Sequence, residues 1–180
     1  MRILIYAGHP AQYHFFKLSV FKLKSEGHEV ILLIKAKDIL EDLIRQDGLA
    51  YINIQPKNRK NNVFSMLVAS LIRTVKVTYY ARRFKVNLLL GTDASVAQAG
   101  FLLRIPTITT LEDDYEIIPK LAKLTYPFTS TILTPTVCKV GKWEYKKIGY
   151  EGYMKLAYLH PNSFTPDLRI KNQYIESNRY

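Results

Sequence analysis

The first 34 residues contain the pattern that most constrains how this chain folds. A short apolar run, Arg2–Tyr6, is followed by the loop sequence AGHPAQYH, by an amphipathic segment, and by a second apolar run, Glu29–Ile34. We expect the amphipathic segment to be a helix that begins near Gln12 and stops at Gly27, where a residue without Cβ tolerates the left-handed conformation. This order predicts a strand–helix–strand unit with parallel strands, and its first loop carries histidines rather than a glycine-rich phosphate cradle.

Apolar runs rich in β-branched residues recur along the chain, and segments of helical length separate most of them. Gly48 is expected to end the second helix as Gly27 ends the first. Strands that alternate with helices pair in parallel through right-handed crossovers. We therefore predict an α/β fold with a doubly wound, mostly parallel, Rossmann-like sheet in which the first and fourth strands are neighbours. About six strands are expected, at Arg2–Tyr6, Glu29–Ile34, Ala50–Ile54, Val86–Leu90, Thr107–Thr110 and Thr131–Thr134.

The composition fits one folded domain with an anionic partner. The chain has 180 residues, of which 48% are hydrophobic, and 26 Lys and Arg outnumber 15 Asp and Glu to give a net charge of +11. This excess favours phosphates, anionic lipid, nucleic acid or an acidic protein. Basic–aromatic recognition motifs and zinc-ligand spacings are not found, so we expect no nucleic-acid partner.

The sequence also predicts where the protein works. A single cysteine, Cys138, excludes an internal disulfide and suits a reducing compartment. No window has the roughly 18 uncharged apolar residues of a membrane span, and the opening residues enter a strand directly. We expect a cytoplasmic protein, with peripheral attachment to the inner face of a membrane as a further possibility.

The segment from Val63 to Lys85 is predicted to be the longest helix, and two interpretations of it stay open. In the first it is a core helix with a solvated basic side; in the second its basic and aromatic residues dock on an anionic membrane. The apolar stripe expected to be buried is Phe64, Leu67, Val68, Leu71, Ile72, Val75 and Tyr79, and the other face carries Arg73, Lys76, Tyr80 and Arg83.

Two histidines flank the first strand-to-helix junction. His9 follows strand one, where ligands of open α/β sheets bind, and an imidazole titrates near neutral pH, so His9 is a candidate general base. His14 precedes Phe15 and Phe16; it either packs the first helical turn or contacts substrate. The histidine spacing matches no zinc motif, and we expect no metal.

A second candidate group follows the fourth predicted strand. Asp93 or Ser95 is an ordinary N-cap for the next helix. The same turn, with Gly91 and Thr92, offers free backbone N–H groups to an anionic substrate. Because strands one and four are expected to be neighbours, Asp93 can also orient a histidine of the first loop.

Four acids, Glu112, Asp113, Asp114 and Glu116, follow the fifth predicted strand. They belong either to a solvated loop before a helix or to the crevice, as acid/base groups or as ligands of sugar hydroxyls. After Pro135 the pattern changes to a Gly-, Tyr- and Lys-rich segment. We expect a Rossmann-like domain over residues 1–160 and a linker over 161–180, since Pro161 and Pro166 favour extended chain.

Several of these motifs resemble one known family. The similarity covers nearly the whole chain, and its most specific part is the pattern GY..LAYLHP..F.PD from Gly152 to Asp167. The chain resembles the N-terminal half of the domain of unknown function 354 family, through that block and through His9-Pro10, His14-Phe15-Phe16, Gly27-His28-Glu29-Val30 and Ile105-Pro106. Members look like two-domain GT-B proteins, akin to glycosyltransferases and UDP-N-acetylglucosamine 2-epimerases, with the active site between two Rossmann-like halves.

The resemblance implies three functions. As the acceptor side of a glycosyltransferase, the chain would use His9 as the base and Asp93 to orient it. As half of a UDP-sugar 2-epimerase, it would use Asp93, Glu112 and Glu116. As a non-enzymatic module, it would bind a partner chain or an anionic surface. The nucleotide-sugar half that the family has after Asp167 is not in this sequence. The implied role is thus half of a split or truncated enzyme of polysaccharide biosynthesis.

The resemblance also implies the partners. They are a nucleotide sugar, a glycan or lipid-linked acceptor and a second-half protein, with no cofactor. An anionic membrane is a further candidate partner, because of the net charge and the basic residues of the segment from Val63 to Lys85.

Overall fold

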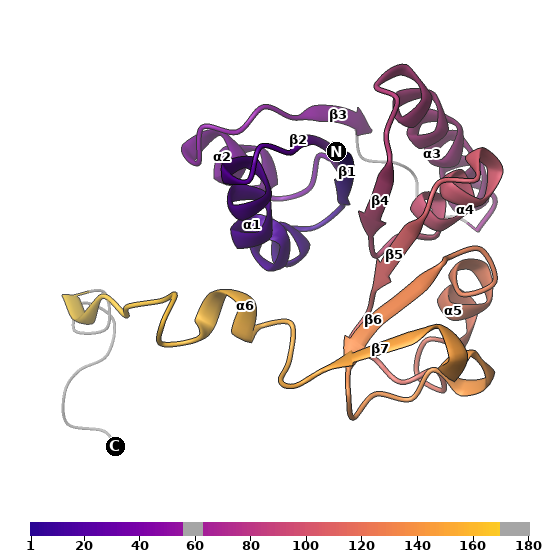
Figure 1. Ribbon diagram of the computed structural model, residues 1–180. Coiled ribbons are helices and arrows are strands. Elements are labelled where there is room, and N and C mark those ends of the chain that lie inside the picture. The colour runs from indigo at the N-terminus through magenta and orange to yellow at the C-terminus, as the bar shows by residue number, and fades with distance from the viewer. Residues whose placement is uncertain (56–62, 170–180) are drawn as a thin grey trace.

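The computed structural model describes residues 1–55 and 63–169, which form one sheet with helices on both sides (Figure 1). The sheet has seven parallel strands in the order β3-β2-β1-β4-β5-β6-β7. In chain order the elements are β1 (Arg2–Ala7), α1 (Pro10–Ser25), β2 (Glu29–Lys35), α2 (Leu40–Gln46), β3 (Ile52–Gln55), α3 (Val63–Arg83), β4 (Leu88–Gly91), α4 (Ala94–Leu103), β5 (Thr107–Thr110), α5 (Pro119–Thr125), β6 (Thr131–Pro135), the 3₁₀ helix η1 (Gly141–Lys146), β7 (Lys147–Tyr150) and α6 (Leu156–Leu159).

The predicted doubly wound parallel sheet is confirmed, including the pairing of the first and fourth strands. Tyr6 lies opposite Gly91 at the ends of β1 and β4. The first helix begins at Pro10, with His9 as its N-cap, and Gly27 follows its end with a φ of +81°. Gly48 follows α2 with a φ of +66°. Both glycines take the left-handed conformation that was expected at the two helix ends.

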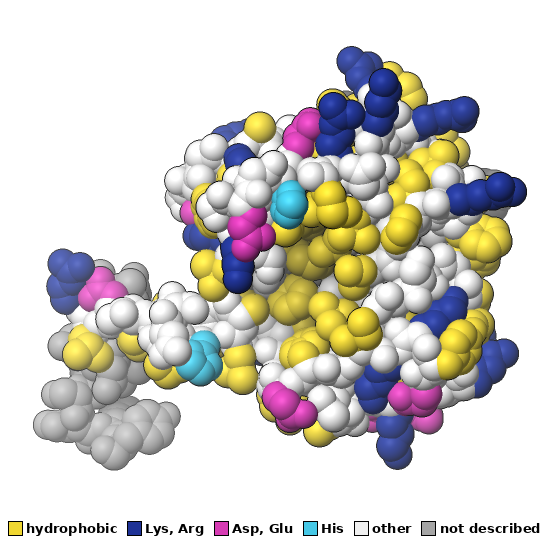
Figure 2. All heavy atoms as spheres, viewed as in Figure 1, with side chains coloured by type: hydrophobic (Ala, Val, Ile, Leu, Met, Phe, Trp, Pro, Cys, Tyr) yellow, Lys and Arg dark blue, Asp and Glu magenta, His cyan; other side chains and the backbone are white. Residues whose placement is uncertain are grey.

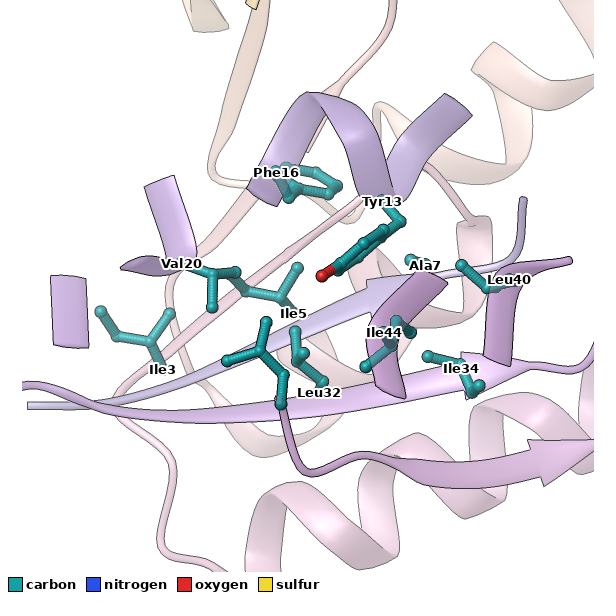
Figure 3. Close-up of a cluster of buried hydrophobic side chains, with 11 residues drawn as sticks. Ile3, Ile5, Ala7, Tyr13, Phe16, Val20, Leu32, Ile34, Leu40 and Ile44 are labelled. Atoms are coloured by element: carbon teal, nitrogen blue, oxygen red, sulfur yellow. The ribbon is translucent and has the colours of Figure 1, made fainter. Parts of the chain in front are cut away.

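Alternate residues of β1 face two separate cores. Ile3, Ile5 and Ala7 point toward α1 and α2 and pack with Tyr13 and Phe16 (Figure 3). Leu4 and Tyr6 point the other way and pack with buried residues of α3 and α4. Because neighbouring residues of a strand point to opposite faces, one apolar run serves both layers. Because all seven strands are parallel, their carboxyl ends meet at one edge of the sheet, between the two helical layers.

The seventh strand was not predicted. β7 pairs in parallel with β6 at the edge of the sheet. It contains Lys147, whose Nζ donates to the carbonyl oxygens of Thr136 and Cys138, and Gly149, where a Cβ would meet Thr136. A strand that needs a lysine for a hydrogen bond and a glycine for close packing carries no apolar run. This explains why the sequence pattern missed it.

The prediction of which α3 face is buried is wrong. Val68, Leu71, Ile72, Val75 and Tyr79 are exposed, whereas Thr74, Val77 and Ala81 are buried. Three of the four residues on the face that was expected to be solvated pack inward: Arg73 is 11% exposed, Lys76 donates to the carbonyl oxygen of Ile54, and Tyr80 packs on the core. The fourth, Arg83, is exposed as predicted. Small residues and two partly buried cations fill the space between α3 and the sheet, so the apolar stripe does not face the sheet. The side chains of Phe64 and Leu67 lie outside the described part.

The segment after β7 leaves the sheet and brings α6 against α1 (Figure 1; Figure 2). Gly152, at a φ of +102°, makes the turn into it. Met154 is then buried at the carboxyl edge of the sheet, and Lys155 precedes α6. In residues 1–55 and 63–169, no helix combines the length and the hydrophobicity that a membrane crossing requires.

Gly100→Ala tests how tightly α4 packs on β5. A Cβ at residue 100 would overlap Oγ1 of Thr107 and lie 2.9 Å from the carbonyl oxygen of Ile105. Backbone cannot move away as a flexible side chain can, so we expect a loss of about 2–3 kcal/mol in urea unfolding. Leu102→Ala on the same helix removes a side chain that is 65% exposed and should change stability by less than about 0.5 kcal/mol. Equal effects of the two substitutions would contradict this packing.

Candidate functional site

The candidate site is a pocket of about 170 Å³ at the carboxyl edge of the sheet. Four parts of the chain form it: the first turn of α1, the residue after β4, the end of β5 with the residues that follow it, and the segment before and within α6. The lining residues are Ala11, Gln12, Thr92, Thr110, Leu111, Glu112, Asp113, Met154, Lys155 and Tyr158. A cavity at this edge is where ligands of open α/β sheets bind, since the strands stop there and the loops diverge.

Glu112 is the charged centre of this pocket. Its Oε1 lies 3.6 Å from Nζ of Lys155, and 29% of its side chain is exposed. Burial, followed by the charges of Glu112 and Cys138, raises the pKa of Tyr150 to about 12, so that phenol stays protonated beside the carboxylate. Asp113 also lines the pocket and is exposed. Two of the four predicted acids therefore reach the crevice.

Hydroxyl groups also belong to this region of the sheet edge. Thr110 is 1% exposed and lines the pocket, yet its Oγ1 has no hydrogen-bond partner. The buried hydroxyl of Tyr150 also lacks a partner. Thr92 is a further lining residue with a hydroxyl. Buried polar atoms without partners are costly, so such a cluster is typical of a site whose hydrogen bonds are completed by a ligand.

His9 stands beside the pocket rather than in its lining. Its Nδ1 accepts a hydrogen bond of 3.2 Å from the backbone N–H of Ala11 and thereby caps α1. A neutral imidazole that accepts at Nδ1 carries its proton on Nε2. In this geometry Nε2 is a donor, and His9 acts as a base only after it releases the cap. Gln12 lies in the lining, and its Oε1 accepts from the N–H of Gly8.

Asp93 is engaged by groups other than His9. Its Oδ1 accepts from the backbone N–H and the hydroxyl of Ser95, at 2.9 and 2.6 Å, and so caps α4. The same oxygen lies 3.3 Å from Nε of Arg73. No hydrogen bond joins His9 to Asp93 in the described structure. Asp93 therefore acts as a helix cap, which is one of its two predicted roles. The predicted pairing with a histidine is not formed.

The other candidate residues lie outside the pocket lining. Gly91 and Ser95 are buried, and a Cβ at Gly91 would press on Val96 and on the carbonyl oxygen of Tyr6. Asp114 accepts from the backbone N–H of Lys139, which ties the acidic loop to the turn after β6. Glu116 is exposed. Substrate contacts by Gly91, Ser95 and Asp114, and a catalytic role of Glu116, remain predictions.

His14 joins α1 to the C-terminal segment. Its ring lies 5.2 Å from the ring of Tyr158, which lines the pocket. Burial, and then the charge of Lys17, lowers the pKa of His14, while Asp47 acts in the opposite direction. His14 thus packs against Tyr158, whereas its contact with substrate stays a prediction.

The lowered pKa of His14 predicts a pH dependence of stability. A folded-state pKa below the unfolded value of about 6.5 means that the unfolded chain binds the proton more readily. Stability is then full above that value and falls as the pH drops through the window below it. We expect a lower urea midpoint at pH 5.5 than at pH 7.5, with a smaller difference in His14→Gln. An unchanged difference in the variant would assign the effect to other groups.

Sequence reasoning missed Gln12, Thr110, Met154, Lys155 and Tyr158. Met154, Lys155 and Tyr158 belong to the GY..LAYLHP block, which supported the family resemblance but was not predicted to contribute to the site. Their approach to strand ends about 40 residues earlier depends on the turn at Gly152, which no local pattern predicts. Among the described residues, no three His, Cys, Asp or Glu side chains gather closely enough to hold a metal ion.

Solved structures share this architecture. The chain matches S. aureus MnaA in a co-structure with UDP (TM-score 0.67, 12% identity, 96% of this chain and 51% of that chain). It also matches Neisseria meningitidis UDP-GlcNAc 2-epimerase bound to UDP-GlcNAc (TM-score 0.67, 14% identity, 98% and 51%). A third match is Acinetobacter baumannii MurG (TM-score 0.64, 12% identity, 97% and 49%).

The chain has the fold of one GT-B half. It spans about half the length of these proteins. At such low identity the likeness shows the fold alone. No protein-family model and no curated protein matches the sequence, so the resemblance to the domain of unknown function 354 family is not confirmed.

Proposed function

We propose that this chain is the acceptor-side half of a GT-B-type glycosyltransferase, and that its pocket holds the sugar group that receives the transferred residue. The observation that carries the proposal is the pocket at the carboxyl edge, where Glu112, Thr110 and Thr92 converge. A carboxylate and hydroxyls are the groups that hydrogen-bond sugar hydroxyls. The matched structures with UDP or UDP-GlcNAc add the class of donor.

The size of the pocket supports a half-site. Pockets that enclose drug-sized ligands measure about 300–1,000 Å³, whereas this one measures about 170 Å³. It has room for a single sugar-sized group but not for a complete nucleotide sugar. The remaining contacts, above all those to the diphosphate, are then supplied by a second Rossmann-like half, on a separate protein or on a longer chain. A glycan or lipid-linked sugar of polysaccharide biosynthesis is the acceptor in this proposal.

The chemistry requires a base beside the acceptor hydroxyl. The base takes the hydroxyl proton, the oxygen forms a bond to the anomeric carbon of the donor, and the nucleoside diphosphate leaves with the electron pair of the broken bond. Glu112 is our first candidate because it lines the pocket and its Oε1 lies 3.6 Å from Nζ of Lys155. His9 is the second, on condition that its Nδ1 releases Ala11.

The second candidate function is half of a UDP-sugar 2-epimerase. It is favoured by the pair of carboxylates, Glu112 and Asp113, in one pocket. There a carboxylate would remove the proton from C2 of the sugar, and a proton would return to the opposite face. Turnover in D₂O separates the two functions, since only the epimerase would place solvent deuterium at C2.

Binding to the isolated chain tests the half-site directly. We expect millimolar binding of monosaccharides such as N-acetylglucosamine in ¹⁵N NMR titrations, with shifts at the amides of Gln12, Thr110 and Glu112. UDP should cause no such shifts. Thr110→Val, which replaces the unpartnered hydroxyl by a methyl group of similar size, should weaken sugar binding about tenfold. Micromolar binding of UDP-sugars by this chain alone in calorimetry would overturn the half-site, and unchanged binding by Thr110→Val would remove Thr110 from it.

A further inference from the structure

The outer face of α3 is apolar although it is exposed. Leu71 and Val75 are 65% and 67% exposed, and they are flanked by three further exposed side chains along the same stripe. Arg82 and Arg83 follow Tyr79 at three and four residues, so they continue this face at the end of the helix. We call this surface the α3 outer face: Val68, Leu71, Ile72, Val75, Tyr79, Arg82 and Arg83.

A surface helix ordinarily places polar residues toward solvent, and α3 does not. Its inward face is also filled, by Val77, Ala81 and the side chain of Arg73. The exposed stripe has the spacing of a core-facing surface, which is why the sequence pattern predicted it to be buried. A helix whose inward side is already packed and whose exposed side is apolar indicates a surface that meets an apolar environment elsewhere.

The charged side chains around this face are almost all basic. Helices α3, α4 and α5 contain no acidic residue, and between residues 48 and 111 the only acid is Asp93, which pairs with Arg73. The opposite layer differs, since Glu41 and Asp42 stand in the first turn of α2. On the side formed by α3 and α4, Lys and Arg side chains project at the margin and hydrophobic side chains lie between them (Figure 2).

We propose that the α3 outer face docks on an anionic lipid bilayer, with the helix lying in the plane of the interface. The aliphatic stripe enters the boundary between headgroups and acyl chains, and Arg82 and Arg83 bind lipid phosphates. Nη1 of Arg83 donates to the hydroxyl of Tyr79 at 2.9 Å, which places a phenol and a guanidinium at the level of the headgroups. This inference does not depend on the proposed function.

Charge decides between a bilayer and other occupants of the face. A second copy would bring two cationic surfaces together, which like-charge repulsion opposes. Nucleic acid would be bound by cations and stacking aromatics, whereas this stripe is mainly aliphatic. An anionic bilayer offers both an apolar interior and negative headgroups, and so complements both properties of the face.

The test is flotation of the full 180-residue chain with vesicles. We expect binding to phosphatidylcholine vesicles that contain 30% phosphatidylglycerol, a loss of binding above about 0.5 M salt, and little binding to pure phosphatidylcholine. Arg82→Glu/Arg83→Glu and Leu71→Ser/Val75→Ser should each lower the partition coefficient at least tenfold. The matched control, Lys22→Glu/Lys24→Glu, makes the same charge change on exposed residues of α1 and should stay within about threefold of the unmodified chain.

Three results would overturn the proposal. One is failure of the unmodified chain to bind anionic vesicles at low salt. Another is an equal loss of binding in the α1 control, which would mean that net charge alone acts. The third is a dimer in sedimentation velocity that Leu71→Ser/Val75→Ser dissociates, which would assign the face to a second copy. Because these substitutions replace exposed residues, thermal melts should stay near those of the unmodified chain.

Discussion

Glu112→Gln is expected to lower the turnover of the complete enzyme, this chain together with a donor-binding half, by about 10²- to 10⁴-fold. Glutamine keeps the size of the side chain and its ability to hydrogen-bond, but it cannot take a proton from an acceptor hydroxyl. Glu112 is the carboxylate that both lines the pocket and pairs with Lys155. Steady-state rates at saturating donor and acceptor measure the effect, and thermal melts should show a small change.

The matched comparison is His9→Asn. Asparagine retains the N-cap of α1 that Nδ1 of His9 supplies, so the helix should keep its start, while the imidazole is lost. With Glu112 as the base, we expect this variant to keep turnover within about tenfold. His9→Ala should in addition cost about 1 kcal/mol of stability through loss of the cap. Normal turnover in Glu112→Gln with a large loss in His9→Asn would make His9 the base.

The fold was largely predictable because its strands are buried on both faces. Leu4 and Ile5 are both fully buried, one on each side of the sheet, so β1 must be a continuous apolar run whatever lies around it. Helix ends were predictable at Gly27 and Gly48, where a positive φ requires a particular residue. These are local requirements, and local requirements are visible in a sequence.

The errors arose where tertiary contacts replaced local pattern. The inward face of α3 uses Thr74, Ala81 and a largely buried Arg73 side chain rather than its most apolar stripe, so periodicity identified the wrong side. At the site, the sequence placed Glu112 and Asp113 at a strand end correctly. It could not show that Lys155 and Tyr158 return to the same edge, because a single turn after β7 decides their position.

Arg73→Met is expected to destabilise the fold by about 3 kcal/mol in urea unfolding at pH 7. The guanidinium is 11% exposed and lies 3.3 Å from Oδ1 of Asp93, whose side chain is 26% exposed. Methionine fills much of the same space but leaves that carboxylate without its counter-charge, and an unpaired, largely buried charge is costly. The value is at the low end for a broken buried pair because Asp93 retains some contact with water.

The double variant Arg73→Met/Asp93→Asn should be more stable than Arg73→Met alone, with a net loss of about 1 kcal/mol. Asparagine still accepts the N–H of Ser95 and caps α4, so removing the second charge relieves the penalty without loss of the cap. Additive losses would mean that the two side chains are not coupled. Asp93→Asn also bears on the site: if Asp93 acts only as cap and counter-ion, this variant loses stability yet keeps turnover, whereas a catalytic Asp93 would lose turnover at unchanged stability.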